Sequence, residues 1–421
     1  PSAGRSFDGY EVSDAAGKIV APGFVDLHTH LRDPGQEWKE TISTGTRAAA
    51  AGGFTTVCAM PNTDPVQDSA AVVLDVIRRS AADGVVRVLP IGAISVGQYG
   101  KQLAPMVELA DAGVIGFSDD GNPVADANLM RQALKYSVEV GLPIINHAED
   151  KKIGAGGVMS AGLVATRLGL AGVPAEAETA MVARDLHLAD LTGARLHIPH
   201  ISTIGSLVAL RTAKECGVNV TAEVTPHHLT LNDEWVFGLQ GEVPEIVGSM
   251  AYDTNTKVNP PLRSRSNVDA VIEALSEGLI DIIATDHAPH AMTDKVCTYD
   301  EAAHGINVLE TAFSSVFALV DAEKISITRL IESLTSGPAA ILGLDLGSLK
   351  KGFSADVTVI DPGRKWVVNP GEFVSKSANS PLAGVELTGR VVQTIYQGET
   401  VFDLNSSAVT AGADVNLGAK A

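Results

Sequence analysis

Apolar, β-rich runs and helix-forming segments alternate eight times between residues 23 and 290, and this alternation limits the folds open to the chain. The eight runs are Phe24–His30, Thr55–Asn62, Val86–Ile94, Val114–Asp120, Pro143–His147, Arg195–His200, Asn219–Pro226 and Ile280–Asp286. Helix candidates between them are Ala70–Ala82, Asn128–Val140, Glu176–Thr192 and Val268–Glu277, and glycines such as Gly141 and Gly193 follow as helix stops. The pattern predicts an α/β fold, a (β/α)8 TIM-type barrel, although a doubly wound open sheet would alternate similarly.

The pattern changes after Leu344, where short strand candidates are separated by Gly, Pro, Asn and Asp turns. These candidates are Ser354–Ile360, Lys365–Val368 and Val391–Val401, and the first residues add Tyr10–Val12 and Lys18–Val20. They predict a small β-sandwich domain formed by the two chain ends, residues 1–22 and 345–404, beside a barrel of residues 23–344. Residues 405–421 are rich in Ala, Gly and Ser and are expected to form a loosely ordered tail.

The composition excludes several classes of partner. The 421 residues include 31 basic and 50 acidic side chains, for a net charge of −19, whereas a nucleic-acid surface needs a basic footprint. No apolar stretch approaches the ~20 residues that cross a bilayer. The three cysteines (Cys58, Cys216 and Cys297) are scattered, which argues against a disulfide framework. We therefore expect a cytoplasmic globular protein without nucleic-acid or membrane partners.

Two histidines spaced one residue apart, His28 and His30, end the first apolar run. Alternation along a strand places both side chains on one face, where two imidazoles can bind one metal ion. Polar side chains with metal-binding or hydrogen-bonding atoms also end the second, fourth, fifth, sixth and eighth runs: Asn62, Asp119, Asp120, Asn146, His147, His200, Asp286, His287 and His290. Active sites of such barrels lie at the carboxyl ends of the strands.

Each of these residues has a structural alternative when it is taken alone. Asp119 and Asp120 could be turn residues, His147 and His200 could be core histidines, and Asp286 could cap the following segment. Those alternatives would have to hold independently at every strand end on the same face of the barrel, which favours a metal site. His187 and His197 lie within a helix and a strand candidate, which favours structural roles, and His227 and His228 are ambiguous.

Four histidines with two carboxylates exceed the needs of one catalytic zinc, which usually takes three protein ligands and water. A two-metal site fits better, because one carboxylate can bridge two cations and two cations lower the pKa of a shared water. A further aspartate can accept the proton of that water and return it to a leaving nitrogen. The predicted reaction class is hydrolysis, or the reverse condensation, at an amide-like carbonyl.

Seven sequence blocks carry a resemblance to a known family. They are Pro22–Gly35, Met60–Thr63, Phe117–Gly121, Asn259–Arg263, Ala284–His290, Ser377–Pro381 and Gly384–Leu387. In this order they resemble the dihydroorotases of the amidohydrolase superfamily over nearly the whole chain.

That resemblance implies a ligand set and a reaction. His28, His30 and Asp286 would hold one Zn²⁺ and His147 and His200 a second, with Asp120 and a hydroxide as bridges, where many relatives use a carboxylated lysine. Asp286 would be the general base and acid. Substrate contacts would come from Arg32, Asn62, Asn259, His290, His304 and Gly305, although relatives commonly carry Phe or Pro at the position of His304. The reaction implied is the reversible cyclisation of N-carbamoyl-L-aspartate to L-dihydroorotate in pyrimidine biosynthesis.

Two other functions stay open. A hydantoinase, dihydropyrimidinase or allantoinase shares the barrel and metals but typically has a lysine on the fourth strand, where this chain has Ser118, Asp119 and Asp120. Arg32 also favours a substrate that carries a carboxylate. An inactive subunit that scaffolds aspartate carbamoyltransferase would lack metal ligands, and here every expected ligand is present. We expect a homo-oligomer, and association with that transferase stays open. The stretch of residues 233–256, between the seventh run and the Asn259–Arg263 block, is longer than expected. The default interpretation is a surface insertion rather than a lid.

Overall fold

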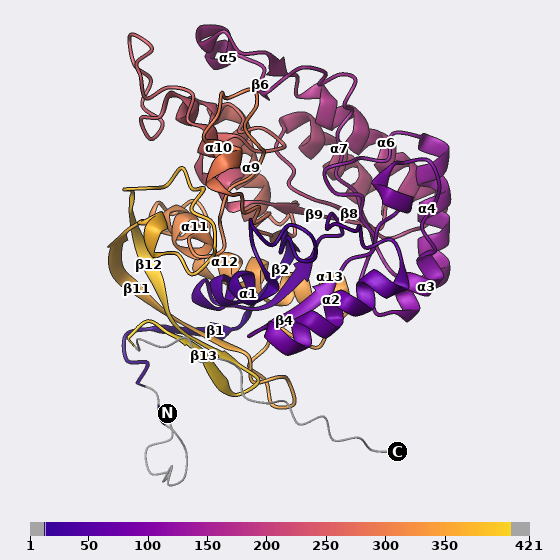
Figure 1. Ribbon diagram of the computed structural model, residues 1–421, viewed down its shortest axis with the longest axis horizontal. Coiled ribbons are helices and arrows are strands. Elements are labelled where there is room, and N and C mark those ends of the chain that lie inside the picture. The colour runs from indigo at the N-terminus through magenta and orange to yellow at the C-terminus, as the bar shows by residue number, and fades with distance from the viewer. Residues whose placement is uncertain (1–11, 13, 406–421) are drawn as a thin grey trace.

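Parallel strands close into a ring with helices on its outer side in the computed structural model, which describes residue 12 and residues 14–405 (Figure 1). The strands are β2 (Phe24–Thr29), β3 (Phe54–Ala59), β4 (Arg87–Pro90), β5 (Ile144–Ile145), β8 (Leu196–Ile198), β9 (Val220–Val224) and β10 (Ile282–Ile283). Single bridges complete the ring, because Phe117 pairs with Gly92 and Ile144, and Thr29 pairs with His287. This closure confirms the predicted barrel and excludes the open sheet.

The fourth run is the least regular part of the ring. A strand over Val114–Asp120 was expected, but only Phe117 pairs with its neighbours. Backbone hydrogen bonds nevertheless join this run to both neighbours, since the N–H of Ser118 donates to Gly92 (2.8 Å) and the N–H of Ile145 donates to Phe117 (2.8 Å). At the end of the run the carboxylate of Asp119 accepts the backbone N–H groups of Ile94 (2.8 Å) and Ser95 (3.0 Å), so a side chain extends the contact with the neighbouring segment.

Helices cover the outside of the ring. The longer ones are α1 (Ile42–Ala51), α2 (Ala70–Asp83), α4 (Ala127–Val140), α6 (Glu176–Thr192), α7 (Ile204–Glu215), α9 (Arg265–Ser276), α11 (Ala312–Asp321), α12 (Ile327–Leu334) and α13 (Ser336–Leu342). The short ones are α3 (Met106–Asp111), α5 (Leu163–Leu168), α8 (Pro226–Thr230) and α10 (Met292–Lys295). Gly141 and Gly193 end α4 and α6 with φ of 72° and 68°, the left-handed conformation that glycine adopts without strain. Among the described residues, no helix is long and apolar enough to cross a membrane.

A four-stranded antiparallel sheet joins the two ends of the described chain. Its order is β1 (Ile19–Pro22), β11 (Val357–Val367), β12 (Glu386–Tyr396) and β13 (Glu399–Asp403). Figure 1 shows β1, in indigo, beside the yellow strands from the other end of the chain. Within residues 14–405 this is one sheet, and its second layer is the barrel itself, through α1 and α11. The division of the chain at residues 22 and 344 stays a prediction.

Three expected strands of this sheet differ from the structure. Ser354–Ile360 and Lys365–Val368 belong largely to one strand, β11, which is irregular between Asp361 and Lys365. The expected strand Val391–Val401 instead spans a hairpin, since Gln397 and Gly398 turn the chain with φ of 52° and 90°. Lys18–Val20 overlaps β1. Tyr10 and Glu11 of the other expected strand, and the tail after residue 405, lie outside the described residues.

The long stretch at residues 233–256 is anchored at both ends, the second of them a 3-10 helix, Thr254–Thr256, in which Thr256 is buried. Its first part forms a 3-10 helix, Asp233–Phe237, and Val236 and Phe237 are buried against Met159 and Leu168. Met159 lies in β6 (Met159–Ser160), which pairs with β7 (Gly172–Val173). The outer part of the stretch exposes Ile246. The stretch is therefore a surface insertion whose middle is exposed and whose attachment to the protein is buried.

Candidate metal centre and substrate pocket

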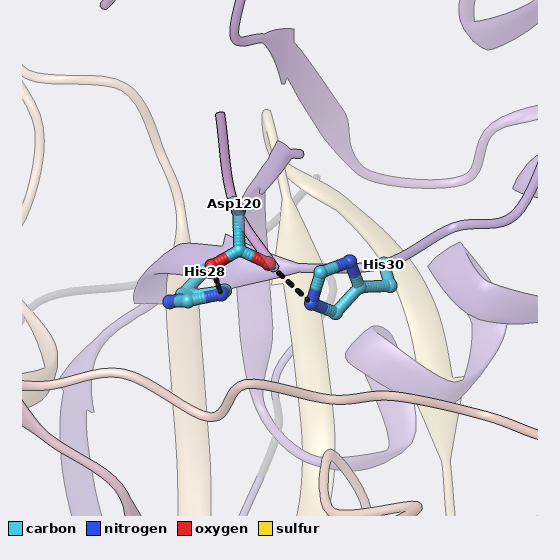
Figure 2. A group of neighbouring side chains, drawn as sticks. All are labelled: His28, His30 and Asp120. Carbon is cyan, nitrogen blue, oxygen red and sulfur yellow. Dashed lines mark ion pairs between the residues drawn. The ribbon is translucent and has the colours of Figure 1, made fainter. Parts of the chain in front are cut away.

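The carboxyl ends of the barrel strands bring the six predicted metal ligands together. His28 and His30 come from β2 and its end, Asp120 follows the Phe117 segment, and the others follow β5, β8 and β10: His147, His200 and Asp286. All six side chains are buried. Two groups have ligand atoms within 4.8 Å of one another, His28–His30–Asp120 and Asp120–His147–His200. Asp120 belongs to both groups, and Figure 2 shows its carboxylate between His28 and His30.

Distances between ligand atoms put the carboxylate of Asp120 within reach of both groups of histidines. Its Oδ2 lies 3.4 Å from His30 Nε2, while its Oδ1 lies 3.5 Å from His28 Nε2 and 3.4 Å from His147 Nδ1. The distance from Oδ1 to His200 Nε2 is 3.8 Å. Asp286 faces the first pair only, with its Oδ1 3.0 Å from His30 Nε2 and 3.4 Å from His28 Nε2. This arrangement suits two cations that share one carboxylate.

Two polar atoms at the centre have no hydrogen-bond partner among the described residues. They are His28 Nε2 and Asp120 Oδ1, both buried. Buried polar atoms are normally paired, so two unpaired atoms that are both metal-ligand types fit a cation between them. The residues present therefore fit a metal site.

The electrostatics of the centre favour ionised carboxylates. Burial alone would raise the pKa of Asp286, but His28 and His30 outweigh it and hold that pKa below its usual range. The pKa of Asp120 is likewise held well below its usual value, since His28 and His147 overcome the effect of burial. Burial lowers the pKa of His147, but Asp120 and Glu149 outweigh it and raise that pKa to about 9. The two carboxylates are therefore ionised and available to a cation, which would displace the proton of His147 on binding.

Unusual backbone geometry coincides with the site. Arg32, His200 and Asp286 are not glycines, yet their φ angles are 61°, 37° and 46°. Such conformations cost free energy and persist where the surrounding structure holds them, often at functional sites. Asp26 provides part of that support, because its carboxylate accepts the N–H groups of Thr285 (2.9 Å) and His28 (3.2 Å). These two hydrogen bonds connect the end of β2 to the segment that follows β10.

Three side chains outside the ligand set contact the far ring nitrogens of three ligand histidines. Glu223 lies 2.8 Å from His28 Nδ1, Asn62 Oδ1 lies 2.9 Å from His30 Nδ1, and Glu149 lies 3.3 Å from His147 Nε2. Such partners fix the tautomer and orientation of a ligand histidine.

Sequence reasoning missed three of these supporting carboxylates, and each had a signal. Asp26 lies two residues before His28 on the same face of a strand, and Glu149 lies two residues after His147. Glu223 is a charged residue inside an otherwise apolar strand. A buried charge in a strand interior needs a buried partner.

A cavity of about 360 Å³ opens onto the centre, within the size range of small-molecule sites. The ligands that line it are His30, Asp120, His147 and Asp286, while His28 and His200 do not. The six predicted substrate contacts also line it: Arg32, Asn62, Asn259, His290, His304 and Gly305. The structure thus brings all of them to one cavity, and their individual roles stay predictions.

Protein contacts already orient several of these lining groups. Arg32 Nη2 lies 3.3 Å from His290 Nε2, which also lies 2.9 Å from the carbonyl oxygen of His304. Lys295 is buried and donates to the carbonyl oxygens of Thr254 (3.1 Å) and Ala303 (2.6 Å). This lysine joins the 233–256 insertion to the loop that carries His304.

The remaining histidines have other surroundings. His287 accepts the N–H of Val308 (3.2 Å) at its Nδ1, away from the ligand cluster. His228 is bound to Thr225 and to the carbonyl oxygen of Pro260. His187 lies in α6, as expected. His227 is buried, and neither ring nitrogen has a hydrogen-bond partner among the described residues. His197 contacts Glu223 (2.9 Å), the carboxylate that also contacts His28.

Comparisons with known proteins define the class and then the family. The fold is similar to an L-hydantoinase from Arthrobacter aurescens (TM-score 0.82, 25% identity, 96% of this chain and 90% of that one). It is also similar to a dihydropyrimidinase from Brevibacillus agri (TM-score 0.81, 22% identity, 96% and 89%). The fold is thus that of a cyclic amidohydrolase.

Sequence similarity is more specific. The family model for dihydro-orotase-like proteins matches residues 17–206. The dihydroorotase of Anaeromyxobacter dehalogenans is 51% identical over 390 residues, 93% of this chain and 88% of that protein. The dihydroorotase of Pelotomaculum thermopropionicum is 50% identical over 394 residues, 93% and 89%. The chain belongs to the dihydroorotase family.

Proposed function

We propose that the protein catalyses the reversible hydrolysis of the cyclic amide of L-dihydroorotate to N-carbamoyl-L-aspartate, a step of pyrimidine biosynthesis. Two Zn²⁺ would be held, one by His28, His30 and Asp286 and the other by His147 and His200, with Asp120 and a hydroxide shared between them. One observation carries the proposal: Arg32, suited to a carboxylate, lines the same cavity as Asp120, which belongs to both ligand groups.

The bound metal ions would polarise the amide carbonyl and supply hydroxide near neutral pH. Asp286 lines the cavity and faces the ligand nitrogens of His28 and His30. Its low pKa keeps it ionised at neutral pH, so it is ready to accept the proton of the attacking water. The same carboxyl then returns that proton to the ring nitrogen as the carbon–nitrogen bond breaks.

Hydrogen bonds within the protein determine what the lining amides can offer to the substrate. The oxygen of the Asn62 side chain is engaged by His30, which leaves its N–H₂ group as a donor to the substrate carboxylate beside Arg32. The nitrogen of the Asn259 side chain donates to Glu149 (2.9 Å), which leaves its oxygen as an acceptor for a ring N–H. Arg32 adds a planar, permanently charged fork that matches a carboxylate.

The proposal also covers the cellular location and the partners of the enzyme. Cys216 and Cys297 are exposed free thiols, which suits a reducing cytoplasm. We include in the proposal a cytoplasmic homo-oligomer, with aspartate carbamoyltransferase as an optional partner. Co-elution of the two purified proteins on a sizing column tests that partnership.

Ring opening of L-dihydroorotate by the purified protein, with dihydrouracil assayed alongside, tests the function. Each assay is run before chelation, after chelation and after Zn²⁺ is restored. We expect activity on dihydroorotate alone, lost with the metal and regained with Zn²⁺. Activity on dihydrouracil would move the assignment to the dihydropyrimidinases. Inactivity on both substrates with zinc bound would contradict catalysis by this chain alone and support a scaffold role.

A further inference from the structure

Strand β9 supplies none of the six ligands, yet it carries a buried glutamate that reaches the centre. The geometry points to Glu223, backed by His197, as a positioning residue that fixes His28 for metal binding. This inference rests on the proposed metal site. Glu223, His28 and His197 have essentially no exposed surface.

Three short contacts join β2 to β9 and β8, although β10 lies between β9 and β2 in the ring. Glu223 Oε1 lies 2.8 Å from His28 Nδ1, and Glu223 Oε2 lies 2.9 Å from His197 Nε2. His197 Nδ1 in turn lies 2.8 Å from Thr221 Oγ1. Both oxygens of the carboxylate thus face a ring nitrogen, one on β2 and one on β8.

The chemistry of the carboxylate determines the state of His28. An ionised carboxylate only accepts hydrogen bonds, so the proton of the His28 ring must lie on Nδ1. In the neutral ring that binds a metal, the lone pair is then on Nε2, the atom that faces Asp120 (3.5 Å) and Asp286 (3.4 Å) and has no hydrogen-bond partner among the described residues. The negative partner also makes the imidazole a stronger ligand.

The other ligand histidines have weaker support of this kind. The partner of His30 Nδ1 is the neutral amide of Asn62, and the partner of His147 is Glu149, which is partly exposed. Glu223 is therefore the fully buried carboxylate that acts on the metal position shared by His28, His30 and Asp286. Its removal should affect that position and leave the position of His147 and His200 intact.

Metal binding to the apo-protein of the full chain tests this role without any substrate. Zn²⁺ affinity is measured by competition with a chromophoric chelator, and Co²⁺ absorption spectra report the ligand set. We expect Glu223→Ala to weaken one of two binding steps about 10–100-fold and to alter the spectrum of one Co²⁺ equivalent. Glu223→Gln should lose less, because its amide oxygen still accepts from His28 while its N–H₂ group donates to His197.

Two further variants keep the test decisive. Glu310→Gln, a carboxyl that accepts two backbone N–H groups away from the cluster, is the matched control and should bind both ions normally. If circular dichroism shows that Glu223→Ala does not fold, His197→Phe replaces it, and a smaller loss at the same binding step is expected. Wild-type affinity at both steps, or equal losses at both, would overturn the inference. Because no substrate is used, failure to open dihydroorotate would refute only the proposed function.

Discussion

The chain buries carboxyl groups in two regions with opposite results. At the barrel mouth, imidazoles surround Asp120 and Asp286 and hold both pKa values below the usual range despite burial. At the boundary between the barrel and the antiparallel sheet, Glu310 accepts only the N–H groups of Val374 (2.9 Å) and Ser375 (3.1 Å). Burial outweighs these bonds and raises the pKa of Glu310 to about 7.

The arginines of the two regions differ in the same way. Arg32 is buried at the mouth, lines the cavity and lies 3.3 Å from His290. Arg390 stacks over the ring of Trp366, 4.4 Å from its centre, and so packs β12 against β11. Neighbours, rather than residue type, therefore decide whether a buried or partly buried charge is available to a ligand or is used in packing.

Among the substitutions predicted here, the loss of Asp286 at the barrel mouth should have the largest effect on activity. Asp286→Ala deletes both a metal ligand and the proposed proton carrier, so we expect kcat for dihydroorotate to fall by at least about 10³-fold while the fold is kept. Turnover and circular dichroism are measured on the same preparation. Activity like that of the wild type would contradict the proposed mechanism.

Replacing arginines at the two regions sharpens the comparison. Arg32→Gln removes a charge-assisted hydrogen-bond donor, worth about 1.5–3 kcal/mol, so kcat/KM for dihydroorotate should fall about 10–150-fold. Arg390→Gln is the matched control and should leave kcat/KM unchanged while it lowers the melting temperature slightly. Equal kinetic losses in both variants would remove the distinction between ligand binding and packing.

The smallest effect is expected for Glu310→Gln, and it concerns stability. The folded pKa of about 7 exceeds the ordinary value of 4.5, so the wild type gains stability from protonation below pH 4.5 and loses it as pH rises through 7. Glutamine mimics the protonated acid at all pH values. The variant should therefore match the wild type near pH 4.5 and exceed it by about 1–3 kcal/mol at pH 8. Urea unfolding at both pH values measures this, and a pH-independent difference would contradict it.

Most of the barrel was predictable because its strands and helices follow local patterns. The four helices expected between strands differ from α2, α4, α6 and α9 by at most three residues at either end. The fourth run was expected as a regular strand, but it forms bridges only at Phe117, and the contacts of the Asp119 side chain with Ile94 and Ser95 follow from no local pattern. The hairpin after Tyr396 was missed because its turn, Gln397 and Gly398, is short and strand-forming residues lie on both sides of it.

The sequence by itself determined the ligand types and their strand ends, because chain-local spacing places His28 and His30 on one face and the others at equivalent ends of later strands. Only the tertiary structure decided that Asp120 lies within reach of both histidine groups, and that Glu223, 195 residues after His28, supports its far nitrogen. The physical reason is closure of the ring. Spacing along one strand is local, whereas contacts across the barrel arise when its strands meet.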